Sequence, residues 1–249
     1  LLETRESDDQ WLQVRLVKGE LVIDVPLVDE PIHSLLRRVQ RVFDLNADAG
    51  AVDTFLRRDP HLGCWVKQAP GLRVPGAWDG FETAVRAVLG QQVSVARGTT
   101  LANKMITQYG AGRFPTPDQL LGREVAELGM PGRRGRAIVL LAEQVLSGRL
   151  NIDDTQHFDS VQRQLEAIEG IGPWTANYIR MRALKDPDAF PDNDWVVLKV
   201  LQCTAARARA QADVWAPWRA YALMYLWYSS SLAVQPQASR SKRNCFTTT

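Results

Sequence analysis

The stretch IEGIGPWTANY, residues 168–178, constrains the fold of this chain more than any other feature. It lies between FDSVQRQLEAI and TANYIRMRAL, two segments in which apolar residues recur at helical spacing. Glycine at Gly170 and Gly172 permits a tight turn whose backbone amides are not shielded by a Cβ atom, and Pro173 suits the first turn of the next helix. Because the N–H groups and dipole of a helix start attract anions, the turn is a candidate phosphate-binding site. An ordinary helical hairpin explains the same residues, so the turn alone leaves both interpretations open.

Composition excludes several classes of protein. The chain has 249 residues and a net charge of +2, so any attraction to a polyanion must come from local clusters of Arg and Lys. Three widely spaced cysteines give no zinc or iron–sulfur pattern, and we expect no cofactor and no redox or catalytic metal; a monovalent cation bound by backbone carbonyls of the 168–178 turn stays open. No stretch of 18 or more apolar residues appears and charges interrupt the N-terminal segment, so we expect no membrane span and no signal peptide. A cytoplasmic location fits these features, and since the chain lacks an initiating Met we expect a fragment or the tail portion of a longer polypeptide.

The first part of the chain predicts a small α+β unit. Residues 11–25 alternate apolar and polar side chains around Lys18-Gly19, which indicates a β-hairpin. Helical spacing follows from Ile32 to Phe43, with Pro31 in the first turn, and a second short helix is expected at 52–57. The segment CWVKQAPGLRVPG, residues 64–76, combines a short strand pattern with turn residues.

From Trp78 onward the pattern is almost entirely helical. Helix ends are marked by Gly90 and Gly148, and helix starts by Ser94 and by Thr116 before Pro117. We therefore predict an α+β protein with three parts: an N-terminal sheet-and-helix domain (1–76), a helical body (77–235) and a basic tail expected to be disordered (236–249).

Several ordered blocks carry a family resemblance. LEAIEGIGPWTANYIRMRAL followed by DAFPDNDWVVLKV resembles the helix-hairpin-helix and Gly/Pro-Asp (HhH-GPD) signature of the DNA glycosylase superfamily. AVRAVLGQQVSVA, FPTPDQL, LGMPGRRGRAI, GIGPWTANY and PWRAYALMYLWY resemble the 3-methyladenine DNA glycosylase II (AlkA-type) branch, in the same order. Relative to that branch, the N-terminal domain is expected to be truncated, without the opening segment that supplies a first strand and pocket aromatics.

The resemblance implies a catalytic aspartate that follows the hairpin and opens the next helix in the pattern Asp-x-x-apolar-x-basic. Asp194 to Lys199 match this pattern without a gap, so Asp194 is expected to be catalytic, with Asp192 as its rival. Asp194 can also serve as a helix N-cap, and the two roles are compatible. A carboxylate near C1′ of the sugar would stabilise oxocarbenium character and orient or deprotonate water.

The same resemblance predicts the base pocket. Trp174 and Trp227 match pocket positions of the family, and Tyr178 is a further candidate whose alternative role is core packing. Aromatic faces attract cations, so such a pocket would favour electron-deficient alkylated purines. Some relatives carry a lysine at the position of Trp174 and also cut the strand, so a monofunctional hydrolase is expected here. Trp215 and Trp218 are expected to be packing residues.

DNA contacts are expected at three places. By match, Gln92 would push into the gap left by the extruded base, where better-known members have an apolar residue, and Gln91 could instead face the protein interior. Gly170, Gly172 and Thr175 of the hairpin are expected to bind phosphate. Basic residues of another cluster could bind phosphate or form a solvated helix face: Arg133, Arg134 and Arg136, with Arg97 and Lys104 upstream.

The sequence thus predicts a monomeric base-excision-repair enzyme that releases 3-methyladenine- and 7-methylguanine-type bases from double-stranded DNA in the bacterial cytosol. Three alternatives stay open. They are a non-catalytic helix-hairpin-helix DNA-binding module in which Asp194 is merely a cap, a glycosylase for deaminated or oxidised bases, and a helical protein-interaction bundle.

Overall fold

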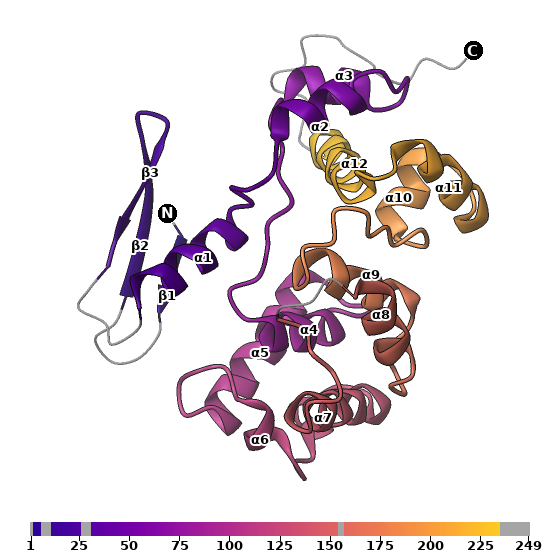
Figure 1. Ribbon diagram of the computed structural model, residues 1–249. Helices are drawn as coiled ribbons and strands as arrows, with labels where there is room; N and C mark the ends of the chain where they lie inside the picture. Colours follow the sequence, from indigo (N-terminus) through magenta and orange to yellow (C-terminus); the bar gives the residue numbers. More distant parts are fainter. Residues whose placement is uncertain (1, 6–10, 26–30, 154–156, 235–249) are drawn as a thin grey trace.

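The computed structural model describes residues 2–5, 11–25, 31–153 and 157–234. Within these residues, a small antiparallel sheet and one helix lie to one side of a larger helical body (Figure 1). The α+β class with a mainly helical body is therefore confirmed. The expected disordered tail, 236–249, lies outside the described residues.

The sheet has the strand order β1-β2-β3, with β1 at Leu2–Arg5, β2 at Trp11–Val17 and β3 at Glu20–Asp24. Strands β2 and β3 form the predicted hairpin, and their last pair sets Val17 opposite Glu20. Both turn residues, Lys18 and Gly19, have positive φ, as two-residue hairpin turns favour. Strand β1 was not predicted, because four residues are too few for a periodic pattern to be recognised.

Helix α1 (Ile32–Val42) follows Pro31 and buries Leu35 and Val39, which confirms the predicted helix. Helix α2 (Ala49–Leu56) confirms the second, although it begins earlier than predicted, because Asp48 caps it by accepting a hydrogen bond from the N–H of Ala51.

The strand pattern predicted within residues 64–76 is wrong, because α3 (Gly63–Gln68) is a helix. The Asp59 carboxylate accepts hydrogen bonds from the N–H groups of His61 and Leu62, which fixes the turn before the helix. Trp65 and Val66 are buried against the C-terminal helices, so tertiary packing overrides the local pattern.

In the described part of the body, ten α-helices or 3-10 helices run from α4 to η2, and a long helix follows them. In chain order they are α4 (Gly80–Leu89), α5 (Val95–Tyr109), α6 (Pro117–Leu120), η1 (Val125–Leu128), α7 (Gly132–Leu146), α8 (Phe158–Glu166), α9 (Pro173–Arg182), α10 (Trp195–Leu201), α11 (Ala205–Ala212), η2 (Asp213–Trp215) and α12 (Arg219–Val234). Gly90, Ser94 and Thr116 occupy the predicted capping positions, while α7 ends two residues before Gly148.

Two hydrophobic clusters make up the described core. The first joins α4, α5, α7, α8 and α9, and the second joins α2, α3 and the helices from α10 to α12. Helix α9 belongs to both, because Ile179 is buried in the first and Met181 in the second, while Tyr178 packs against each. The candidate site residues on α9 are therefore held between two cores.

Buried polar pairs attach the N-terminal part to α12. The hydroxyl of Tyr221 donates to Asp44 (2.8 Å), and that of Tyr225 donates to Asp53 (2.7 Å). Lys185 also pairs with Asp44, with 2.8 Å between Nζ and Oδ1. Since residues 49–74 share a core with α12, the domain boundary expected near residue 76 stays a prediction. None of the described helices has the length and hydropathy needed to cross a bilayer.

Candidate active site

The predicted helical hairpin is present as α8 and α9, joined by residues 167–172. Gly170 has φ +95°, and a Cβ atom there would lie 2.9 Å from Cβ of Ala137 and 3.2 Å from the carbonyl oxygen of Arg133, so this position requires glycine. Gly172 has φ −98°, and a Cβ atom there would meet nothing within 4 Å. The turn is thus packed against α7 on one side and open on the other.

Asp194 is the N-cap of α10. Its Oδ1 accepts hydrogen bonds from the N–H groups of Val196 (3.0 Å) and Val197 (3.1 Å), which satisfies the start of the helix. The expected cap is therefore confirmed, and it fixes the orientation of the carboxylate.

Two tryptophans also donate to this carboxylate. Nε1 of Trp174, on α9, lies 2.9 Å from Oδ2, and Nε1 of Trp227, on α12, lies 3.1 Å from Oδ1. Asp194 is 7% exposed, so these charge-assisted bonds form away from bulk water. Within the described part of the chain, Oδ1 accepts three hydrogen bonds and Oδ2 accepts one. Each carboxylate oxygen has about two lone pairs, so Oδ2 is the oxygen with room for a further partner.

The three predicted pocket aromatics lie together. Tyr178 stacks on Trp174 with ring centroids 5.3 Å apart and planes 20° apart, and its centroid is 6.4 Å from that of Trp227. The guanidinium of Arg182 lies 5.7 Å from the Tyr178 ring centroid. All three rings are partly exposed. The structure thus brings the predicted aromatic residues to the predicted aspartate, with Tyr178 stacked on Trp174.

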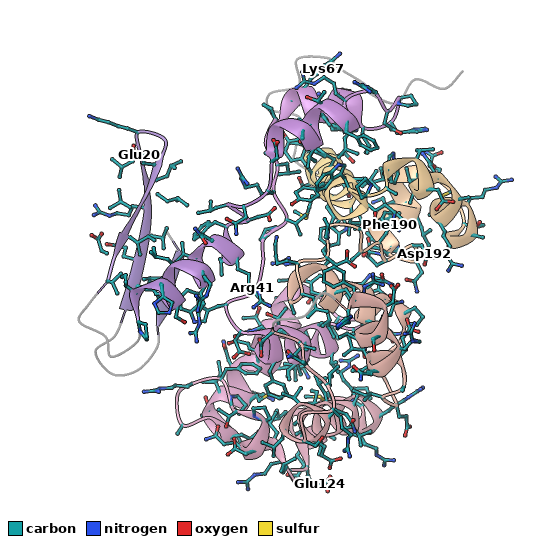
Figure 2. All side chains as sticks on the ribbon, viewed as in Figure 1. Glu20, Arg41, Lys67, Glu124, Phe190 and Asp192 are labelled. Atoms are coloured by element: carbon teal, nitrogen blue, oxygen red, sulfur yellow. The ribbon has the colours of Figure 1, made fainter. Side chains whose placement is uncertain are left out.

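The rival carboxylate has a different partner. Oδ2 of Asp192 pairs with Nε of Arg209 on α11 at 2.5 Å, whereas Asp194 lies between the indoles. Figure 2 labels Asp192 and Phe190 in the segment that leads from α9 to the start of α10. Of the two aspartates, it is Asp194 that the fold places beside the aromatic residues.

The link between α4 and α5 carries the predicted intercalating residue. Gln92 is exposed and has φ +52°. The side chain of Gln91 instead turns inward, and its Nε2 donates to the carbonyl of Gly170 (3.0 Å) and to Oγ1 of Thr175 (2.9 Å). The alternative in which Gln91 faces the interior is confirmed.

The residues predicted to bind phosphate differ in their surroundings. Arg133 has a side chain 73% exposed, with Nε 3.9 Å from Oε1 of Glu169. Arg134 donates to the carbonyl of Gln91, and partial burial lowers the pKa of its guanidinium. The side chain of Thr175 is buried and bonded to Gln91. The phosphate roles stay predictions, but the Arg134 and Thr175 side chains already have protein partners.

Upstream, Arg97 and Lys104 of α5 donate to the carbonyls of Gly129 (2.7 Å) and Leu128 (3.1 Å). Arg136 is exposed on α7. The first two therefore bind the C-terminal end of η1, which favours a structural role for them.

Trp215 and Trp218 pack as predicted. Trp215 is 1% exposed, donates to Oδ2 of Asp59 (2.7 Å) and meets Phe190 edge to face, while Trp218 contacts Tyr221 in the same way.

Among the described residues, no three His, Cys, Asp or Glu side chains gather in a way that could hold a metal ion.

Sequence reasoning missed two features of the site. The indole hydrogen bonds to Asp194 and the bridge from Gln91 to the hairpin join residues far apart in the chain. Nothing in the local spacing could have indicated either pair.

Two features define the helix-hairpin-helix DNA glycosylase class. One is a helical hairpin with an open glycine turn, and the other is an aspartate that follows the hairpin and starts the next helix beside aromatic rings. Residues 4–79 match the family model described as the AlkA N-terminal domain. The chain is 36% identical over 213 residues to DNA-3-methyladenine glycosylase 2 of Escherichia coli, covering 80% of this chain and 73% of that protein. The chain therefore belongs to the AlkA family of DNA-3-methyladenine glycosylases.

Two further comparisons agree. A probable bifunctional transcriptional activator/DNA repair enzyme AlkA of Mycobacterium tuberculosis is 38% identical over 205 residues, which cover 76% of this chain and 41% of that longer protein. The solved 3-methyladenine DNA-glycosylase of Archaeoglobus fulgidus has the same fold, with a TM-score of 0.72, 18% identity and coverage of 93% of this chain and 90% of that one.

Proposed function

We propose that this protein is a monofunctional DNA glycosylase that hydrolyses the N-glycosidic bond of alkylated purines in double-stranded DNA, as the first step of base-excision repair. The substrates are bases of the 3-methyladenine and 7-methylguanine type. The observation that carries the proposal is the buried Asp194 carboxylate held between the indoles of Trp174 and Trp227. Relatives named for 3-methyladenine release support the substrate class.

Asp194 supplies the charge that the reaction needs. As the bond from C1′ to the base nitrogen breaks, its electron pair leaves with the base and the sugar gains oxocarbenium character. A fixed carboxylate stabilises this positive charge without having to reorganise, and Oδ2 has room to face the sugar or the attacking water. Water then bonds to C1′ and loses a proton, which leaves an abasic site with a hydroxyl group.

The leaving group explains why one carboxylate suffices. An N3- or N7-alkylated purine is already cationic and departs as a neutral base, so no general acid has to protonate it. Trp174 stands where strand-cutting relatives have a lysine amine, so this enzyme uses water as its nucleophile and leaves the strand intact.

The aromatic residues select the base. A cationic ring over an aromatic face gains about 0.5–2 kcal/mol relative to a neutral one. Trp174 and Trp227 lie beside Asp194 with their rings partly exposed, and Tyr178 supports Trp174 by stacking on it. Binding and cleavage therefore both favour alkylated purines.

DNA is contacted by the hairpin turn, Arg133 and Gln92. The open side of the hairpin turn at Gly172 binds the phosphate backbone, and the exposed Arg133 adds a positive charge. Gln92 fills the gap left by the extruded base. The protein acts on duplex DNA as a monomer in the bacterial cytoplasm.

A single-turnover assay tests the proposal. Duplexes carrying one 3-methyladenine, 7-methylguanine, hypoxanthine or 8-oxoguanine are incubated with excess protein, and base release and strand cutting are measured separately. We expect release of the two methylated bases without strand cutting. Faster release of hypoxanthine or 8-oxoguanine would reject the substrate class, and binding without any release would favour a non-catalytic DNA-binding module.

A further inference from the structure

The amide of Gln91 ties the α4–α5 link to the hairpin. Both hydrogens of its Nε2 are used, one for the carbonyl of Gly170 at 3.0 Å and one for Oγ1 of Thr175 at 2.9 Å. Gly170 lies in the hairpin turn and Thr175 in the first turn of α9, where it is 3% exposed. One side chain therefore bonds to both parts of the element that faces the DNA backbone in the proposed function.

A second contact fixes the backbone of the same residue. The guanidinium of Arg134, on α7, donates to the carbonyl oxygen of Gln91. Helix α7 is also the surface on which the turn packs, since a Cβ atom at Gly170 would clash with Ala137. The link, the hairpin turn and the start of α7 thus meet at Gln91.

Gln92, the next residue, has a backbone conformation that needs such support. Its φ of +52° lies in the left-handed region, which is unfavourable for a residue that has a Cβ atom. A strained conformation persists where the surrounding structure over-determines it. Because both the side chain and the carbonyl of Gln91 are held, Gln92 is fixed in this conformation with its side chain exposed.

We infer that Gln91 is a positioning residue that sets the register between the hairpin, which grips the strand, and Gln92, which enters the base stack. This inference rests on the proposed function. Extruding a base breaks its stacking and pairing, and the wedge contributes only if it meets the step next to the gripped phosphate. The Gln91 bridge provides that alignment before DNA binds.

The test exploits substrates that need no extrusion. In Gln91→Leu, the side-chain volume is kept but both hydrogen bonds are lost. We expect base release from a methylated duplex to fall by about tenfold or more, since small misplacements of positioning groups have effects of this order. Release from the same methylated sequence as a single strand should be unchanged, and 2-aminopurine fluorescence next to the lesion should report less unstacking.

Two further variants separate positioning from stability. Gln91→Leu combined with Thr175→Val removes the unpaired buried hydroxyl, so it should recover thermal stability without recovering the duplex rate. Gln164→Leu is the matched control, because Nε2 of Gln164 donates to the carbonyl of Arg149 at 3.0 Å, at the far end of α7. This control should keep both rates.

The outcomes are distinct. Equal loss on single- and double-stranded DNA, no loss on either, or a duplex rate that returns together with stability would each overturn the positioning role. If the wild-type protein releases no methylated base from either substrate, the proposed function itself fails.

Discussion

The indole Nε1 of Trp174 lies 2.9 Å from Oδ2 of Asp194, so a pocket ring and the proposed catalytic carboxylate form one bonded unit. Trp227 completes the unit from α12 with a bond of 3.1 Å to Oδ1. Each indole thereby has a fixed orientation, with its N–H directed at the carboxylate. The same two residues orient the carboxylate, and we propose that they also stack with the base.

Replacing the carboxylate tests its charge. Asp194→Asn keeps an oxygen that can cap α10, but it loses the negative charge and presents an amide to one of the indole donors. We expect single-turnover release of 7-methylguanine to fall by about 100-fold or more, the order seen when one preorganised electrostatic group is removed. Asp192→Asn is the control, because Asp192 pairs with Arg209, and it should retain activity. A larger loss in the control would transfer the catalytic role to Asp192.

Replacing an indole by a phenyl ring separates its two roles. Trp227→Phe keeps an aromatic face but removes the donor to Oδ1 of Asp194. We expect a rate reduced by about tenfold, which corresponds to one charge-assisted hydrogen bond, with little change in affinity for product DNA. Trp215→Phe is a matched control, since Trp215 makes an indole bond of 2.7 Å to Asp59 outside the site. It should lower the melting temperature and leave the rate per folded molecule unchanged. Similar rates for wild type and Trp227→Phe would show that the N–H is dispensable.

Some of this site could be predicted from the sequence, for physical reasons. The hairpin and Asp194 depend on local rules, because glycine, proline and a capping aspartate fix the backbone within a few residues. Helix α3 could not be predicted in the same way, because the packing of Trp65 against the C-terminal helices stabilises it. The bonds from Trp227 to Asp194 and from Gln91 to Gly170 are likewise set by tertiary packing. Local chemistry thus predicted the hairpin turn and the cap, the family resemblance indicated which residues form the site, and packing determined how they are held.

The strained conformation of Gln92 predicts that one substitution will affect stability and duplex activity differently. Gln92→Gly should preserve or raise stability, because glycine adopts φ +52° without strain. Release from methylated duplex DNA should nevertheless fall, while release from a single strand stays constant, because the side chain that fills the gap is gone. Gln202→Gly is a matched control, since Gln202 is exposed with φ +50° at the end of α10. If Gln202→Gly lost duplex activity to the same extent, the loss in Gln92→Gly would not be caused by impaired base extrusion.

Exposure distinguishes the neighbouring arginines of α7. Arg133 is free to meet a phosphate, so Arg133→Ala should reduce the slope of log affinity against log salt concentration by about 0.9 for duplex DNA. Arg134→Ala should instead impair duplex base release, because it removes the donor to the carbonyl of Gln91. Arg149→Ala, three residues beyond the C-terminal end of α7, is the control for a general loss of charge. Fluorescence anisotropy at several salt concentrations measures the slopes, and identical slopes for all the variants would exclude a phosphate contact by Arg133.

Two buried tyrosines predict how stability depends on pH. Burial and hydrogen bonds to Asp44 and Asp53 raise the pKa values of Tyr221 and Tyr225 above the ordinary value of about 10. The folded state therefore holds these protons more tightly than the unfolded chain, so their contribution is fully present below pH of about 10 and is lost as the pH rises through the folded pKa. Urea unfolding at a series of alkaline pH values should show a free energy of unfolding that falls once the pH exceeds about 10. The double variant Tyr221→Phe and Tyr225→Phe should be less stable at neutral pH, because two buried carboxylates lose their donors, but its stability should fall less steeply above the same point. Parallel curves for the two proteins would mean that these hydroxyls do not hold the N-terminal part against α12 as protonated donors.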